Sequence, residues 1–229
     1  MAKKIKHPYL LDASYQVYET GQFDELENVI VKIYEYTDKA EDEQLELDER
    51  KDYLEIKIKR IIPSREIDDV LDIADSDSAE LLHAIAPILK EGHDEFIANA
   101  LKIDNTILLS KYIYIDSIQK HGEFSEQSIP AALSRALKVI TKGLESEDWV
   151  AIIYEAHTIS EQNNEVDMKR NKVGSVLKNL GFFALPEVVS NVEKEHNILN
   201  IVGGNTLNKN LEYSPEMLEE TKKDKKVKP

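Results

Sequence analysis

A short basic segment near the C-terminus holds the side chains best suited to contact an anion. Residues 168–180 contain four basic residues and no acidic one, although the whole chain has a formal net charge of −15. If these residues form a helix, its outer face presents ammonium, amide and hydroxyl groups, which hold phosphates and read the edges of bases. The sequence therefore predicts DNA contacts from Lys169, Arg170, Asn171, Lys172, Ser175, Lys178 and Asn179.

Two Glu-x-x-His pairs are the next candidates for chemistry, Glu80 with His83 and Glu193 with His196. This spacing places a carboxylate and an imidazole on one helical face, as di-iron bundles require. No matching pair of glutamates lies on an obviously apolar face, and 44 acidic residues with six histidines make chance pairs common. We therefore interpret His83 as a partly buried helix residue and His196 as a helix-end residue, and we expect no metal site.

Catalytic motifs are absent from the sequence. Asp72, Asp75 and Asp77 lack the glycine and the terminal glutamate of a calcium loop, so helix capping explains them better. There is no phosphate loop, dinucleotide glycine pattern or nucleophile elbow. Because the chain also has no cysteine, thiolate chemistry is excluded. These absences predict a non-enzymatic protein that needs no cofactor.

The apolar pattern of the first 145 residues predicts a helical domain, because glycine and proline are scarce and fall mostly between segments of helical period. Helices are expected over 8–20 and 24–36, and a solvated acidic helix face or a linker over 38–52. Ser64, Ser78 and Ser128 are expected to cap three further helices. The most apolar segment, residues 96–118, is predicted to form the central core helix or helices.

The basic segment is expected to lie within a group of two helices and two strands that begins at residue 146. Ser146 is expected to cap one helix, and a second helix over 167–180 ends at Gly181. The inward face of this second helix consists of Val173, Val176, Leu177 and Leu180. Two strands are predicted over 197–202 and 206–213, joined by a Gly-Gly-Asn turn at 203–205.

This order of elements resembles the winged helix-turn-helix family. The resemblance rests on Asn-Lys-Val-Gly-Ser-Val-Leu-Lys-Asn-Leu-Gly-Phe at 171–182, the hairpin, and Tyr-Ser-Pro-Glu-Met-Leu at 213–218. It implies that the helix ending in Leu-Gly-Phe enters the major groove and that the hairpin wing, which carries Lys209, touches the adjacent backbone. The expected fold is mainly α, with a helical domain over 1–145, a winged-helix-like domain with a small β-hairpin over 146–221, and a disordered basic tail over 222–229.

Charge and targeting signals narrow the expected role. A net charge of −15 argues against a general, sequence-independent nucleic-acid binder. No secretory signal or membrane span is visible, so we expect a cytoplasmic protein that does not act at a membrane. The prediction is a DNA-binding regulatory or accessory protein with a protein partner or a homo-oligomeric state. The alternative is an acidic helical adaptor, a protein-interaction subunit of a larger complex without DNA contact.

Overall fold

In the computed structural model, the N-terminal part of the chain forms an antiparallel meander of β1 Leu11–Glu19, β2 Leu26–Glu35 and β3 Tyr53–Ile61. In β2, every second side chain from Val29 to Ile33 is buried and the residues between them are partly exposed. This period of two, with β-branched residues on the buried side, is typical of a strand with one covered face. The structure describes residues 11–19, 25–35, 51–62, 67–103, 110–124, 128–145, 148–154, 160–161, 177–186 and 199–208.

The rest of the described chain contains both helices and strands. Three helices follow β3, namely α2 Ile67–Asp77, α3 Ala79–Leu89 and α4 Asp94–Leu101. The remaining described elements are β4 Lys111–His121, α5 Ile129–Ile140, β5 Trp149–Tyr154, β6 Ser160–Glu161, β7 Phe183–Ala184 and β8 Leu199–Gly203. None of the helices in the described residues is long and apolar enough to cross a membrane.

One mixed sheet joins the described strands in the order β1-β2-β3-β4-β5-β8-β7, with β6 also paired to β4. Neighbours from β1 to β4 are antiparallel, whereas β4 and β5 are parallel and are connected through α5. Strand β8 is antiparallel to both β5 and β7. Since β5 and β8 extend the sheet that begins with β1, this sheet crosses the expected domain boundary at residue 145.

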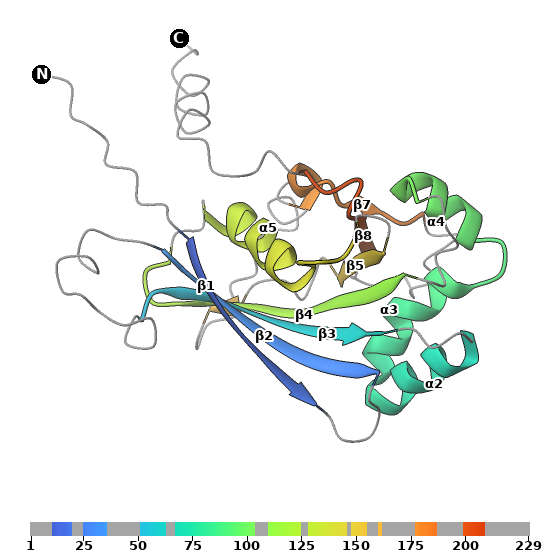
Figure 1. Cartoon of the computed structure of the whole chain (residues 1–229), viewed down its shortest axis with the longest axis horizontal. Coiled ribbons are helices and arrows are strands. Elements are labelled where there is room, and N and C mark those ends of the chain that lie inside the picture. Colours follow the sequence, from blue (N-terminus) through green and yellow to red (C-terminus); the bar gives the residue numbers. More distant parts are fainter. Residues whose placement is uncertain are drawn as a thin grey trace, which may run out of the picture.

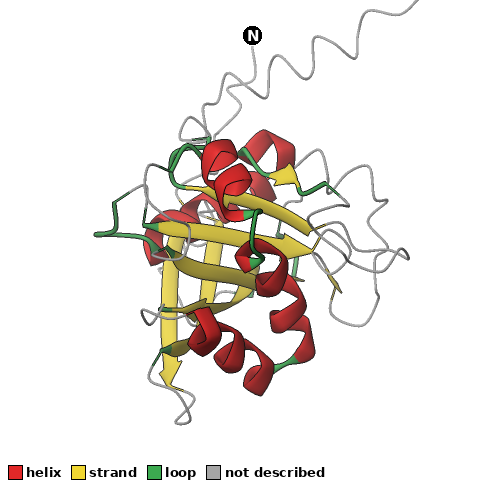
Figure 2. Ribbon diagram, turned by 90° about the vertical axis from the view of Figure 1, so that its right-hand side faces the viewer, coloured by secondary structure: helices red, strands yellow, loops and turns green. Residues whose placement is uncertain are grey.

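Helices cover both faces of the sheet, as Figures 1 and 2 show. Helix α5 lies on one face, where its apolar side packs on β2, β3 and β4 in a cluster that includes Ile56, Ile115 and Leu137. Helices α2, α3 and α4 form a second cluster on the other face, around Ile61, Ile85 and Tyr112. Burial of apolar surface on both faces is the main stabilising contribution in such a layered fold.

The predicted fold class, mainly α, is wrong. The helices expected over 8–20 and 24–36 are β1 and β2, and the core helix expected over 96–118 is α4 followed by β4. The helix expected after Ser146 is β5. All of these segments are rich in valine, isoleucine and tyrosine, whose branched or aromatic side chains fit a pleated surface. Short apolar runs fit both the helical period of 3.6 residues and the strand period of two, so the apolar pattern alone did not distinguish helix from strand.

Three of the expected helices are confirmed. Helix α2 follows Ser64, and the Ser78 side chain caps α3 by accepting a hydrogen bond from the Leu81 amide at 3.2 Å. Helix α5 begins after Ser128 with Pro130 in its first turn, although no side-chain cap bond forms there. The acidic segment expected over 38–52 lies outside the described residues except for Lys51 and Asp52.

Arg60 connects the two layers. Its guanidinium forms an ion pair with Glu27, the directly opposite residue on β2, and donates to the Ile140 carbonyl at the end of α5 over 3.2 Å. We expect Arg60→Ala to lower the free energy of unfolding by about 2 kcal/mol, because Glu27 and a helix-end carbonyl lose a partly buried partner. Urea unfolding measures this, and Arg135→Ala, at an exposed position on α5, is the matched control. Equal losses for the two variants would contradict the prediction.

Candidate functional site

Only two of the eight residues predicted to contact DNA lie in the described part of the chain. Lys178 and Asn179 are exposed on a helical turn, while Leu177 and Leu180 are buried, so this part of the predicted inward face is confirmed. The remaining six lie outside the described residues and are Lys169, Arg170, Asn171, Lys172, Ser175 and Lys209. DNA binding, a protein partner and a homo-oligomeric state therefore stay predictions.

The elements expected around this turn differ from a winged helix. The helix expected after Ser146 is strand β5, and β8 lies inside the sheet between β5 and β7, where the first strand of the hairpin wing was expected. After β8 the chain turns at Gly203, and the Asn208 amide donates to the Leu180 carbonyl at 2.9 Å. The strand that follows the Leu-Gly-Phe element, β7, pairs with β8 in the mixed sheet, which contradicts the mainly α fold expected here. The resemblance to the winged helix-turn-helix family stays a prediction.

The two Glu-x-x-His pairs form no metal site in the described residues. His83 is exposed on α3, in contrast to the partly buried position expected, and Glu193 and His196 lie outside the described residues. No group of three or more His, Cys, Asp or Glu side chains in the described part of the chain is arranged to hold a metal ion. Asp72 and Asp75 are exposed on α2, whereas Asp77 ends that helix and contacts the sheet.

The central strand β4 contains a β-bulge. Lys57 of β3 pairs with Ser117, but the next residue, Ile58, pairs with Ile115, so Asp116 is the extra residue on β4. Bulges bend a strand and re-aim its side chains, and they are over-represented next to active sites. Here the bulge places a carboxylate in the middle of the sheet, on the face that α2 and α3 partly cover.

Asp116 is half-buried and lacks a hydrogen-bond or ion-pair partner among the described residues. Burial raises the pKa of the Asp116 carboxyl, and the Lys59 ammonium, the strongest charged influence on it, lowers that pKa in part. The Glu80 carboxylate acts in the raising direction. A half-buried carboxylate with a raised pKa and no fixed partner is a candidate for proton transfer or for ligand binding.

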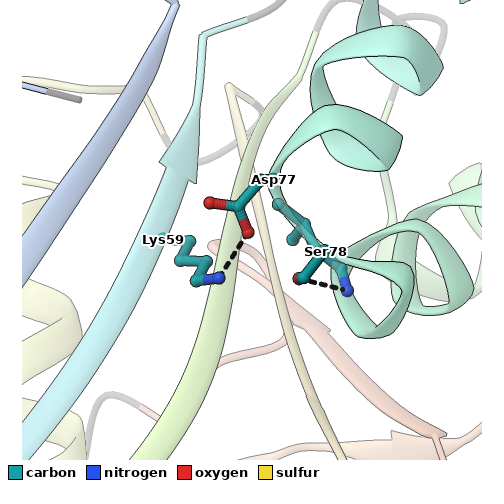
Figure 3. A network of polar contacts seen from close by, with 4 residues as sticks. Lys59, Asp77 and Ser78 are labelled. Atoms are coloured by element: carbon teal, nitrogen blue, oxygen red, sulfur yellow. Dashed lines mark hydrogen bonds and ion pairs between the residues drawn. The ribbon is translucent and has the colours of Figure 1, made fainter. Parts of the chain in front are cut away.

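The corner between α2 and α3 holds the nearest charged group in place. Lys59 of β3 forms an ion pair with Asp77, the last residue of α2, and the side chains of both are mostly buried, at 19 % and 14 % exposed. Ser78 follows immediately and caps α3, as Figure 3 shows. One short segment therefore ends a helix, starts the next and binds a lysine of the sheet.

Negative charge dominates around the bulge. Three carboxylates and two ammonium groups gather here, which gives the cluster a net charge of −1; they are Asp77, Glu80, Asp116, Lys57 and Lys59. Lys59 is ion-paired with Asp77, and Lys57 lies 4.0 Å from Glu55. Each lysine therefore lies beside another carboxylate, and neither forms an ion pair with Asp116 among the described residues.

An aromatic row crosses the far end of the same sheet face. Tyr34, Tyr53 and His121 are direct cross-strand neighbours, with ring centroids 5.4 Å apart for the two tyrosines and 4.3 Å apart for Tyr53 and His121. The Lys32 ammonium lies 5.1 Å from the centroid of the Tyr53 ring. Burial lowers the pKa of His121, and its Nε2 atom is buried without a hydrogen-bond partner in the part of the chain that the structure describes. Lys57 lies four positions along β3 from Tyr53, or about 13 Å away.

The other edge of β4 also changes partner at the bulge. Strand β5 pairs with β4 as far as Ile115, and β6 resumes the pairing at Gln119. Both pairings are parallel, and α5 starts beyond the carboxyl end of β4. In open α/β sheets, ligands bind at the carboxyl ends of parallel strands. Asp116 lies at the middle of β4, between the two paired segments, and beside it is the carboxyl end of β5.

Comparison with known protein families, curated proteins and solved structures finds no match for this chain. The site is therefore defined by its own geometry alone. Sequence reasoning missed Asp116 because it assigned 96–118 to a helix. The signal in the sequence was the consecutive polar pair Asp116-Ser117, which interrupts an alternating run of isoleucines and tyrosines.

Proposed function

We propose that this protein binds a small molecule with a protonated amine on the sheet face beside α3, where the Asp116 carboxylate accepts the ammonium group. The observation that carries the proposal is the half-buried Asp116 carboxylate at the β4 bulge, which has no hydrogen-bond or ion-pair partner among the described residues. A charge in such a place is costly unless a partner compensates it. A cationic ligand supplies that partner.

The charges around the bulge favour an amine over an anion. The cluster has a net charge of −1, and the protein as a whole has a net charge of −15, so an approaching cation is attracted at short and long range. A charge-assisted hydrogen bond from an ammonium to a carboxylate is about twice as strong as a neutral one.

Binding of tyramine and spermidine to the full chain tests the proposal. Tyrosol, which has a hydroxyl in place of the amine of tyramine, serves as the neutral probe. We expect amide chemical shifts of β3 and β4 to move with tyramine and with spermidine, and Asp116→Asn to weaken binding about tenfold or more, as expected for loss of a charge-assisted hydrogen bond. Asp72→Asn, on the exposed side of α2, is the matched control and should bind as the natural protein does.

Three results would contradict the proposal. One is that neither amine moves the resonances of β3 and β4. Another is that Asp72→Asn and Asp116→Asn weaken amine binding equally, because binding would then depend on the overall negative charge and not on this carboxylate. Equal binding of tyrosol and tyramine would show that the amine is not recognised, with the same consequence.

A further inference from the structure

The Lys59 ammonium lies within electrostatic reach of two carboxylates that come from different elements. It is ion-paired with Asp77 at the end of α2, and it is also the strongest charged influence on Asp116 of β4. On β3, Lys59 pairs across to Tyr114, two residues from the bulge. The same lysine could therefore neutralise either carboxylate, and the structure shows it bound to Asp77.

The two carboxylates differ in how firmly they are held. Asp77 is the last residue of α2, directly followed by Ser78, whose side chain caps α3. Asp116 lies on a bulge without a fixed partner. A lysine has a flexible four-carbon stem and behaves as a mobile point charge. If the Asp77 charge were removed, Lys59 would lose its ion-pair partner, and the Asp116 carboxylate, whose pKa Lys59 already lowers, would be available to replace it.

We propose that Asp77 is a positioning residue, which holds the Lys59 ammonium at the α2–α3 corner and so keeps the Asp116 carboxylate open to the amine of a ligand. This inference rests on the proposed function for the identity of the ligand. It makes Lys59 an internal competitor of that ligand, since both are ammonium groups that bind one carboxylate. The corner between α2 and α3 then sets the ligand affinity without touching the ligand.

A double-mutant cycle in the full chain tests this inference. The variants are Asp77→Asn, Lys59→Met and the double variant, and the readouts are the Asp116 pKa from carboxyl carbon NMR and the affinity for tyramine. With Lys59 present, we expect Asp77→Asn to lower the Asp116 pKa and to weaken tyramine binding about tenfold, because the released ammonium binds Asp116. In the Lys59→Met background, the same change should alter affinity by about twofold at most, the effect of one partly screened charge.

Ser78→Ala is the control for the integrity of the corner, because it removes the cap of α3 without changing a charge. It should leave the Asp116 pKa unchanged. If Asp77→Asn has the same effect on that pKa with and without Lys59, or if Ser78→Ala reproduces it, the positioning role is refuted. Absence of tyramine binding by the natural protein refutes the proposed function instead, and the pKa cycle, which needs no ligand, still decides whether Asp77 keeps Lys59 away from Asp116.

Discussion

Replacing Gly181 by alanine should destabilise the protein by about 3 kcal/mol, because left-handed strain and a collision with backbone add up at this position. Gly181 has φ +97°, a conformation that an L side chain rarely adopts. A Cβ atom there would collide with the Thr206 carbonyl oxygen and lie 3.1 Å from its carbonyl carbon. The contact partner is backbone, which the Asn208 amide ties to Leu180, so it cannot rotate away as a side chain would.

Gly92→Ala separates the two contributions. Gly92 has φ +82°, but a Cβ atom there would have no heavy atom within 4 Å. We expect a loss of about 1 kcal/mol from left-handed strain alone. Urea unfolding of both variants gives the two free energies. If Gly181→Ala costs no more than Gly92→Ala, the close approach of the turn at 181 to the chain after β8 is not a constraint on the fold.

Helices with end signals could be predicted from this sequence, and strands without them could not. Ser78 with Leu81 and the Pro130 turn mark helix starts by side-chain chemistry that acts within one turn, so α3 and α5 were visible. Strand β2 has no such local mark. Its partner residues lie 19 to 35 positions away on β3 and 8 to 24 positions away on β1, and this pairing selects a period of two over a helix.

The candidate site was harder to predict than the fold because its parts meet only across the sheet. Lys59 and Asp77 are separated by a strand end and a whole helix, and Asp116 comes from a third element. Nothing in their local sequence relates them. The polar pair at Asp116-Ser117 shows that the strand is interrupted, but the carboxylate gains its raised pKa from burial that depends on α2, α3 and the neighbouring strands.

The basic segment illustrates how a local pattern misled the prediction of the fold around it. Lys178 and Asn179 are exposed and Leu180 is buried, as a recognition helix would also require. The two folds differ in the elements that surround this turn. Strand β8 pairs with β5 and β7 in one sheet, and Leu177 and Leu180 pack in the core cluster of that sheet.

Amine binding should disappear in acid, and this pH dependence identifies the group that binds. The Asp116 carboxylate is the form that holds an ammonium, and burial raises the pKa of that carboxyl above its usual value of 3.8. Below the raised pKa, affinity for tyramine should fall about tenfold for each pH unit, because the ionised fraction falls by that factor. The amine itself stays protonated throughout this range. In Asp116→Asn the residual affinity should not change over the same window.

The free energy of unfolding should fall as pH rises, whereas the affinity for the amine rises. Because the pKa is raised by folding, the folded state binds more protons than the unfolded one between the usual value and the raised value, so the natural protein loses stability as pH rises through that window. Asp116→Asn removes the cost of burying the charged carboxylate. At pH values above the raised pKa, the variant should therefore be more stable than the natural protein by about 0.5 kcal/mol, a value reduced for the solvent screening of a half-exposed group. Urea unfolding at several pH values measures both proteins. If Asp116→Asn were less stable than the natural protein at neutral pH, the Asp116 carboxylate would stabilise the fold. The proposal that this carboxylate costs stability and serves a ligand would then be contradicted.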